Sequence, residues 1–314
     1  MTILRTALAA AAVSVVSIVH ASATPEVVVS IKPVHSLVAS VMDGVGTPKL
    51  IVDGAASPHS YSLRPSQARD LSGADVVFWV GHELEAFLEK PIETLGRDAV
   101  AVELLDTAGL HRLGYREGAA FEEDDHDDHD KHGHDHGHDN EALDPHIWLD
   151  PVNAEILIRR IAQVLADADP TNAARYRANA AAAMARLAAL GEEIEGLLAP
   201  VRERPFVVFH DAYHYFEARF RLHAAGSVTV SPETVPGAAR VREIQARIRE
   251  LGATCVFTEP QFTPKLIQVV TEGTEARTSI LDPLGASLEP GPDLYGALLT
   301  AMASSFRACL EPRS

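Results

Sequence analysis

Histidines and carboxylates are concentrated in one segment of the chain. Residues 122–139 contain six histidines, nine acidic residues and no apolar side chain. Neutral imidazole is a common protein ligand for zinc, copper and nickel, and alternating histidines let neighbouring rings chelate one ion. Because such a segment cannot repay the entropy cost of ordering, we expect a disordered loop, either a solvated acidic linker or an accessory metal-binding segment. The accessory ligands would be His126, His129, His132, His134, His136 and His138.

Three other histidines are better placed for a defined metal site. His59 follows a predicted strand, His146 precedes a predicted helix, and His210 ends a predicted strand. Ligands of open α/β sheets gather at the carboxyl ends of the strands. Three imidazoles with one carboxylate or water complete the tetrahedral shell that zinc favours, and Asp282, at the end of another predicted strand, is the candidate carboxylate. Each histidine alone would more often have a structural role, and their spacing does not show that they converge.

The elements that must position these residues alternate along the chain. Short β-branched and aromatic runs predict strands at residues 26–31, 49–52, 76–80, 99–103, 206–209, 254–257 and 278–281. Helical spacing of apolar residues predicts helices at residues 35–42, 65–71, 84–95, 151–168, 170–198, 213–220, 238–251, 264–273 and 293–310. We therefore expect an α/β fold of two α/β lobes, each with a central sheet flanked by helices, joined by one long helix, with a metal cleft between the lobes.

The sequence also predicts a leader and the limits of the lobes. A basic start, an apolar run and the small residues Ala21 and Ala23 predict a signal peptide over residues 1–23, and no cysteine follows it to accept a lipid. The mature protein would be periplasmic and not lipid-anchored. The expected parts are an N-terminal lobe at 24–150 with the His/Asp-rich loop 117–142, helices at 151–200 with the linking helix 170–198, and a C-terminal lobe at 201–314.

Composition narrows the class of partner and the compartment. The formal net charge of −17 argues against nucleic acid and favours a cationic solute. The sequence has no phosphate-binding glycine loop, which argues against a nucleotide enzyme. The two cysteines, Cys255 and Cys309, favour a structural disulfide in an oxidising compartment.

Several stretches of the chain resemble one transport family. They are Ile31-Lys32-Pro33, residues 54–65 (GAASPHSYSLRP), Trp79-Val80-Gly81, Trp148-Leu149, residues 209–213 (FHDAY), residues 254–262 (TCVFTEPQF) and residues 281–285 (LDPLG). Together with the His/Asp-rich loop they resemble the zinc-uptake solute-binding proteins of bacterial ATP-binding-cassette transporters, the ZnuA type. The resemblance implies that His59, His146 and His210 are zinc ligands and that the two cysteines are bonded. Pro58 stands where some zinc members carry a glutamate, so Asp282 or a water is expected as fourth ligand.

The expected function is therefore high-affinity capture of Zn²⁺ in the periplasm and its delivery to a membrane permease, by a monomer without enzymatic activity. Two alternatives stay open. The acidic loop could instead make the protein a periplasmic zinc buffer or chaperone. Three histidines with an open position could also form a catalytic zinc that activates water in a hydrolase, although the chain has no H-E-x-x-H helix.

Overall fold

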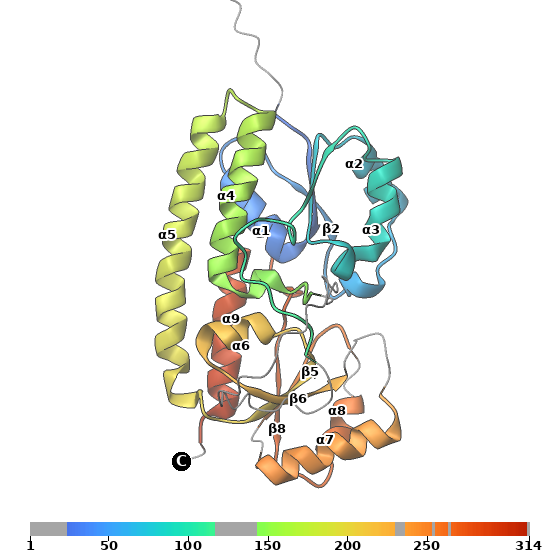
Figure 1. The fold of residues 1–314 in the computed structure, drawn as a ribbon, viewed down its shortest axis with the longest axis vertical. Coiled ribbons are helices and arrows are strands. Elements are labelled where there is room, and N and C mark those ends of the chain that lie inside the picture. Colours follow the sequence, from blue (N-terminus) through green and yellow to red (C-terminus); the bar gives the residue numbers. More distant parts are fainter. Residues whose placement is uncertain (1–23, 117–142, 230–235, 253–254, 263–264, 313–314) are drawn as a thin grey trace, which may run out of the picture.

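The computed structural model describes residues 24–116, 143–229, 236–252, 255–262 and 265–312 (Figure 1). These residues form two four-stranded parallel sheets, one above the other, beside a layer of long helices. No helix in the described ranges is long and apolar enough to span a bilayer. The predicted leader at residues 1–23 and the His/Asp-rich loop at 117–142 lie outside the described residues.

The N-terminal sheet has the strand order β2-β1-β3-β4, with parallel pairing throughout. Its elements are β1 (Val27–Ile31), α1 (Lys32–Met42), β2 (Lys49–Val52), α2 (Pro65–Ser72), β3 (Val76–Trp79), α3 (His82–Thr94) and β4 (Val100–Glu103). Strands β1 and β3 are buried at every position, which explains their nearly unbroken apolar sequences. Helix α1 begins at Lys32 and not at residue 35, because Pro33 is suited to the first turn.

The C-terminal sheet has the strand order β6-β5-β7-β8 and is also parallel. Its elements are β5 (Phe206–His210), α6 (His214–Phe220), β6 (Ala224–Thr229), α7 (Ala238–Leu251), β7 (Cys255–Thr258), α8 (Lys265–Thr271) and β8 (Arg277–Ile280). Strand β6 was not predicted from the residue pattern. Its sequence AAGSVT is poor in strand-forming residues, so pairing with β5 and burial at all six positions decide its structure.

Three long helices lie beside the two sheets (Figure 1): α4 (Pro151–Ala168), α5 (Ala173–Leu198) and α9 (Leu294–Leu310). Helix α5 packs against α1 and α4 and also against α9 and α6, so it contacts helices from both halves of the chain. Its 26 residues span about 39 Å at 1.5 Å per residue. It begins later than the predicted residue 170, because the Asp169 carboxylate accepts hydrogen bonds from Asn172 and closes a turn before the helix.

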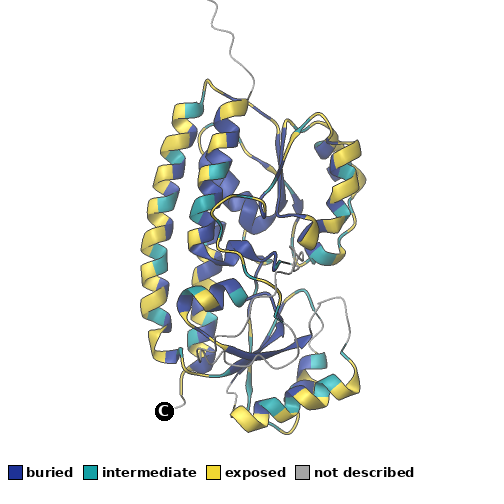
Figure 2. Cartoon of the chain, viewed as in Figure 1, coloured by how far each residue is buried: buried dark blue, intermediate teal, exposed yellow. Residues whose placement is uncertain are grey.

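Buried contacts hold the two halves together. One hydrophobic core includes residues of β1, Trp148, and residues of β5 and β7, and Figure 2 shows buried residues in both sheets and in the segments between them. Lys32, at the start of α1, is only 3% exposed. Its ammonium group donates to the carbonyl oxygens of Ala286 (3.1 Å) and Leu288 (2.6 Å) in the C-terminal half. The lobes are thus joined by apolar packing and by a buried charged donor.

A disulfide joins Cys255 in β7 to Cys309 in α9, with their Cα atoms 6.0 Å apart, which confirms the predicted bond. The bond links positions that are 54 residues apart. Both cysteines are buried, so the bond joins the C-terminal helix α9 to the second sheet within the core.

We predict that removing this bond destabilises the protein substantially. In the chain-entropy model a closed loop of this length stabilises the folded state by roughly 4 kcal/mol, because it restricts the unfolded chain. Urea unfolding of the Cys255→Ala/Cys309→Ala variant should show that decrease in the free energy of unfolding relative to the oxidised protein. An unchanged unfolding midpoint would contradict a stabilising role for the bond.

Candidate metal centre

Three histidines from separate segments converge between the two sheets. His59 lies in a 3-10 helix (Pro58–Ser60) after β2, His146 precedes a second 3-10 helix (Ile147–Leu149), and His210 is the last residue of β5. One ring nitrogen of each lies within 4.8 Å of those of the other two. The ring centroids are 5.5, 6.0 and 5.4 Å apart. The structure therefore brings together the three histidines predicted as zinc ligands, around a single point.

Carboxylates fix the orientation of two of these imidazoles. The Nδ1 atom of His146 lies 2.6 Å from Oδ1 of Asp144, which also accepts the His146 backbone N–H at 2.9 Å. The Nδ1 atom of His210 lies 2.6 Å from Oε1 of Glu259. The two Nε2 atoms then face each other at 3.5 Å, a separation that suits two ligands of one zinc ion at about 2.1 Å each. Carboxylate–imidazole pairs of this kind orient metal-binding histidines and raise their basicity.

Burial shapes the electrostatics of these pairs. Asp144, His146, His210 and Glu259 are each at most 4% exposed. Burial, together with the charge of His210, lowers the pKa of His146 well below its usual value, and burial raises the pKa of Asp144 to about 7. Burial opposes protonation of His210, but the carboxylates of Glu259, Asp211 and Asp144 together outweigh it and raise the pKa of His210. A divalent cation at the Nε2 atoms would supply the positive charge that these buried carboxylates lack.

The histidines line a small cavity with mostly apolar walls. Its volume is about 10 Å³, which is near the lower limit for holding a small inorganic species. The other lining residues are Ser57, Pro58, Leu84, Trp148, Glu259, Gln261, Phe262, Pro283 and Leu284. The Trp148 side chain is fixed there, because its Nε1–H donates to the carbonyl oxygen of Pro283 at 2.9 Å. The cavity suits an ion with one small inorganic ligand and is far smaller than the pockets that hold organic ligands.

The structure does not bring Asp282 into this group. Its Oδ1 atom accepts the backbone N–H groups of Leu284 (3.1 Å) and Gly285 (3.0 Å), and its Oδ2 atom accepts that of Ala286 (2.6 Å). Within the described ranges, the group of possible metal ligands consists of the three histidines. The six histidines of the predicted accessory loop lie outside these ranges.

The two orienting carboxylates, Asp144 and Glu259, were not predicted from the sequence. Asp144 stands two residues before His146, a spacing that allows one oxygen to reach both the backbone and the ring. Glu259 directly follows β7, and its position at a strand end was the only signal available. Its partner His210 is 49 residues away, so their contact could not be read from local spacing.

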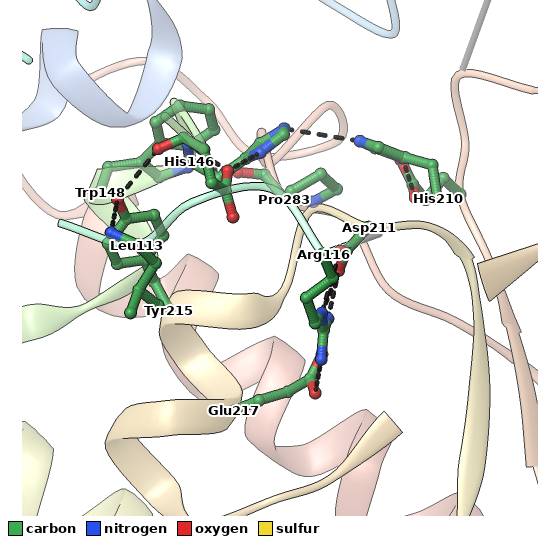
Figure 3. A network of polar contacts seen from close by, with 11 residues as sticks. Leu113, Arg116, His146, Trp148, His210, Asp211, Tyr215, Glu217 and Pro283 are labelled. Atoms are coloured by element: carbon green, nitrogen blue, oxygen red, sulfur yellow. Dashed lines mark hydrogen bonds and ion pairs between the residues drawn. The ribbon is translucent and has the colours of Figure 1, made fainter. Parts of the chain in front are cut away.

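A buried ion-pair network lies next to the histidines (Figure 3). Arg116, the last described residue before the His/Asp-rich loop, is 17% exposed. Its guanidinium group donates to the Asp211 carboxylate at 2.9 Å and to the Glu217 carboxylate at 2.8 Å. Asp211 directly follows His210, and Glu217 lies in α6. One cation thus compensates two buried carboxylates beside a metal ligand.

The same region supports His146. The Tyr215 hydroxyl, on α6, accepts the backbone N–H of Leu113 at 3.0 Å and donates to the carbonyl oxygen of Asp144 at 3.0 Å (Figure 3). The backbone N–H of Asp144 donates to the carbonyl oxygen of Leu113 at 2.9 Å. Both segments that flank the His/Asp-rich loop are therefore docked on α6, and Asp144 is held where it can orient His146.

We predict that Arg116→Met lowers the free energy of unfolding by about 3–5 kcal/mol, because it leaves Asp211 and Glu217 buried without their cation. Urea unfolding of the metal-free protein measures this change. Arg159→Met is the matched control, since the Arg159 side chain is 58% exposed and pairs with Glu155 on the same helix face. We expect a change of less than about 1 kcal/mol there, and equal effects of the two substitutions would contradict the prediction.

Comparison with known proteins agrees with this geometry. Residues 27–309 match the family described as "Zinc-uptake complex component A periplasmic". The "High-affinity zinc uptake system protein ZnuA" of Brucella suis is 53% identical over 315 residues, with 91% of each chain covered. The protein of the same name from Paracoccus denitrificans is 41% identical over 314 residues, with 96% of each chain covered. A solved structure described as "Crystal structure of ZnuA" superposes with a TM-score of 0.76 at 25% identity, covering 92% of this chain and 100% of that one. This chain belongs to the family of periplasmic zinc-uptake components of the ZnuA type.

Proposed function

We propose that this protein captures Zn²⁺ in the periplasm and delivers it to the membrane permease of an ATP-binding-cassette transporter for zinc uptake. The observation that carries the proposal is the convergence of three imidazole nitrogens within 4.8 Å, in a cavity sized for one ion. High-affinity zinc uptake is also the function given in the names of the relatives at 53% and 41% identity. Zinc is the transported solute, and no chemical step is required of the protein.

The donor set favours zinc as the solute. His59, His146 and His210 each offer a neutral nitrogen, and imidazole suits zinc better than it suits the harder ions magnesium, calcium or manganese. We propose a water as the fourth ligand, because both carboxylate oxygens of Asp282 already accept hydrogen bonds. Asp144 and Glu259 are then not ligands. Their hydrogen bonds hold the rings of His146 and His210 in the tautomer that binds the ion.

The compartment and the partners follow from the same proposal. A signal peptide at residues 1–23 would export the chain without a lipid anchor, and the mature protein would act as a monomer. The permease is the partner to which the ion passes. The histidines of residues 126–138 would serve as an accessory segment that gathers zinc near the cavity.

A zinc hydrolase is a weaker candidate. Three histidines with a water could activate that water for attack on a substrate. The cavity of about 10 Å³ leaves no room for an organic substrate beside the ion. A periplasmic zinc buffer of the kind considered above would bind zinc tightly in the His/Asp-rich loop, whereas a transport protein would bind it in the cavity. The substitution of His210 and the deletion of the loop together distinguish the two.

We predict that His210→Ala weakens zinc binding by more than about 100-fold, because it removes a ligand and not merely an orienting group. Calorimetry with a competing chelator measures the dissociation constant. His82→Ala is the matched control, since this side chain is 60% exposed and pairs with Glu89 away from the cavity. Its zinc affinity should equal that of the unsubstituted protein.

Deletion of residues 122–139 completes this test. Transport through the cavity predicts that one tight site survives the deletion while weaker sites disappear. If tight binding instead vanishes with the deletion and persists in His210→Ala, the protein is a buffer that stores zinc in the loop.

We also predict that zinc affinity falls as the pH falls, because protons compete with zinc for the ring nitrogens. His210 has a raised pKa, so it takes up its proton before His146 does and the loss begins above the ordinary histidine value of about 6.5. The lowered pKa of His146 means that its proton competes only at lower pH. Chelator competition between about pH 8 and pH 5.5 measures the effect, and Glu259→Gln should move its onset to lower pH. An affinity that does not change over this range would contradict the prediction.

A further inference from the structure

Gln261 has an unusual place in the cavity wall. It lies two residues after Glu259 and lines the cavity together with the three histidines. Its amide nitrogen donates to Oδ1 of Asp282 at 3.2 Å. Its carbonyl oxygen Oε1 is buried and has no hydrogen-bond partner among the described residues. No other residue of the cavity wall has a buried side-chain nitrogen or oxygen without a partner in the described part of the chain.

The orientation of this amide is determined by its neighbour. An ionised carboxylate accepts hydrogen bonds and cannot donate them, so the NH₂ group of Gln261 must face Asp282. Asp282 cannot turn away, because it also accepts the backbone N–H groups of Leu284, Gly285 and Ala286. The Gln261 carbonyl oxygen is therefore held away from Asp282, as an acceptor that lacks a donor.

A buried acceptor without a donor is unfavourable and is uncommon in folded proteins. Such an acceptor is accounted for when a bound ligand supplies the missing hydrogen-bond donor. The three imidazoles leave one place free in a tetrahedral zinc shell, and a water in that place carries two O–H donors that the metal makes more acidic. Glu259 is already engaged by His210, so it is less available as the acceptor.

We infer that Gln261 accepts a hydrogen bond from the water that completes the zinc shell and that Asp282 positions Gln261 for this task; this inference rests on the proposed zinc site. Asp282 is then not a zinc ligand, and it acts on the water only through Gln261. A neutral amide holds the water without adding a charged ligand, so the water in the fourth coordination position of the zinc stays exchangeable. An exchangeable place suits a protein that must release its ion.

The test uses full-length Gln261→Met, which keeps the length of the side chain and removes the acceptor. Gln245→Met is the matched control, because Gln245 is partly buried and also loses one amide hydrogen bond, to the carbonyl oxygen of Val269 at 2.8 Å. Zinc affinity is measured by chelator competition. The fourth place is probed in the Co²⁺-loaded proteins by the visible absorption spectrum during titration with azide, which replaces a metal-bound water.

We expect Gln261→Met to weaken zinc binding by about fivefold to tenfold, the effect of losing one hydrogen bond, and azide to replace the water at a concentration lower by about the same factor. Gln245→Met should change neither quantity. The metal-free Gln261→Met protein should unfold at no lower temperature than metal-free Gln245→Met, since each loses one amide hydrogen bond and Gln261→Met also removes the unpaired buried acceptor.

Equal zinc affinities and azide titrations in the two variants would overturn the inference. Weaker zinc binding by Gln261→Met with an unchanged azide titration would also overturn it, because Gln261 would then act through packing alone. The zinc site itself has a separate test: the Co²⁺ spectrum of the unsubstituted protein must be lost in His210→Ala. If Gln261→Met has no effect while the Co²⁺ spectrum depends on His210, only the inference about Gln261 is wrong, and the proposed transport function still stands.

Discussion

Two short hydrogen bonds, from the Nδ1 atoms of His146 and His210 to buried carboxylates, are the interactions on which the metal centre depends. An imidazole can present either nitrogen, and only a fixed partner on one of them makes the other a reliable ligand. Asp144 and Glu259 provide those partners in an environment from which water is nearly excluded. The Nε2 atoms consequently meet at 3.5 Å, where an ion can bridge them.

The fold brings these pairs together from opposite halves of the chain. His59 lies just after a strand of the first sheet and His210 ends a strand of the second, so the cavity forms where the two sheets face each other. Helix α5 packs against helices of both halves, and Lys32 reaches from α1 to the segment at residues 286–288. These contacts fix the distance between the ligands, which a hinge of loosely joined lobes would leave variable.

Charge is arranged in layers around the cavity. Neutral imidazoles contact the ion position, carboxylates lie behind them, and Arg116 compensates Asp211 and Glu217 farther out. The apolar side chains of Trp148, Leu84 and Phe262 line the cavity and lower its polarity, which strengthens every electrostatic interaction inside it. The same arrangement places the described segments that flank the His/Asp-rich loop beside the ligands, on α6.

The sequence by itself determined the alternation of elements through residue types and local spacing, the disulfide through the count of two cysteines, and the three candidate histidines through their positions near predicted elements and the family resemblance. Residues 238–251, for example, were predicted to be a helix and form one with the same bounds. Strand β6 could not be predicted, since its small residues become a strand only through pairing with β5. The tertiary structure alone decided that the histidines converge, that Glu259 orients His210 across 49 residues, and that Asp282 binds backbone N–H groups. The first two are contacts between side chains distant in sequence, and their distances are set by how the two sheets pack.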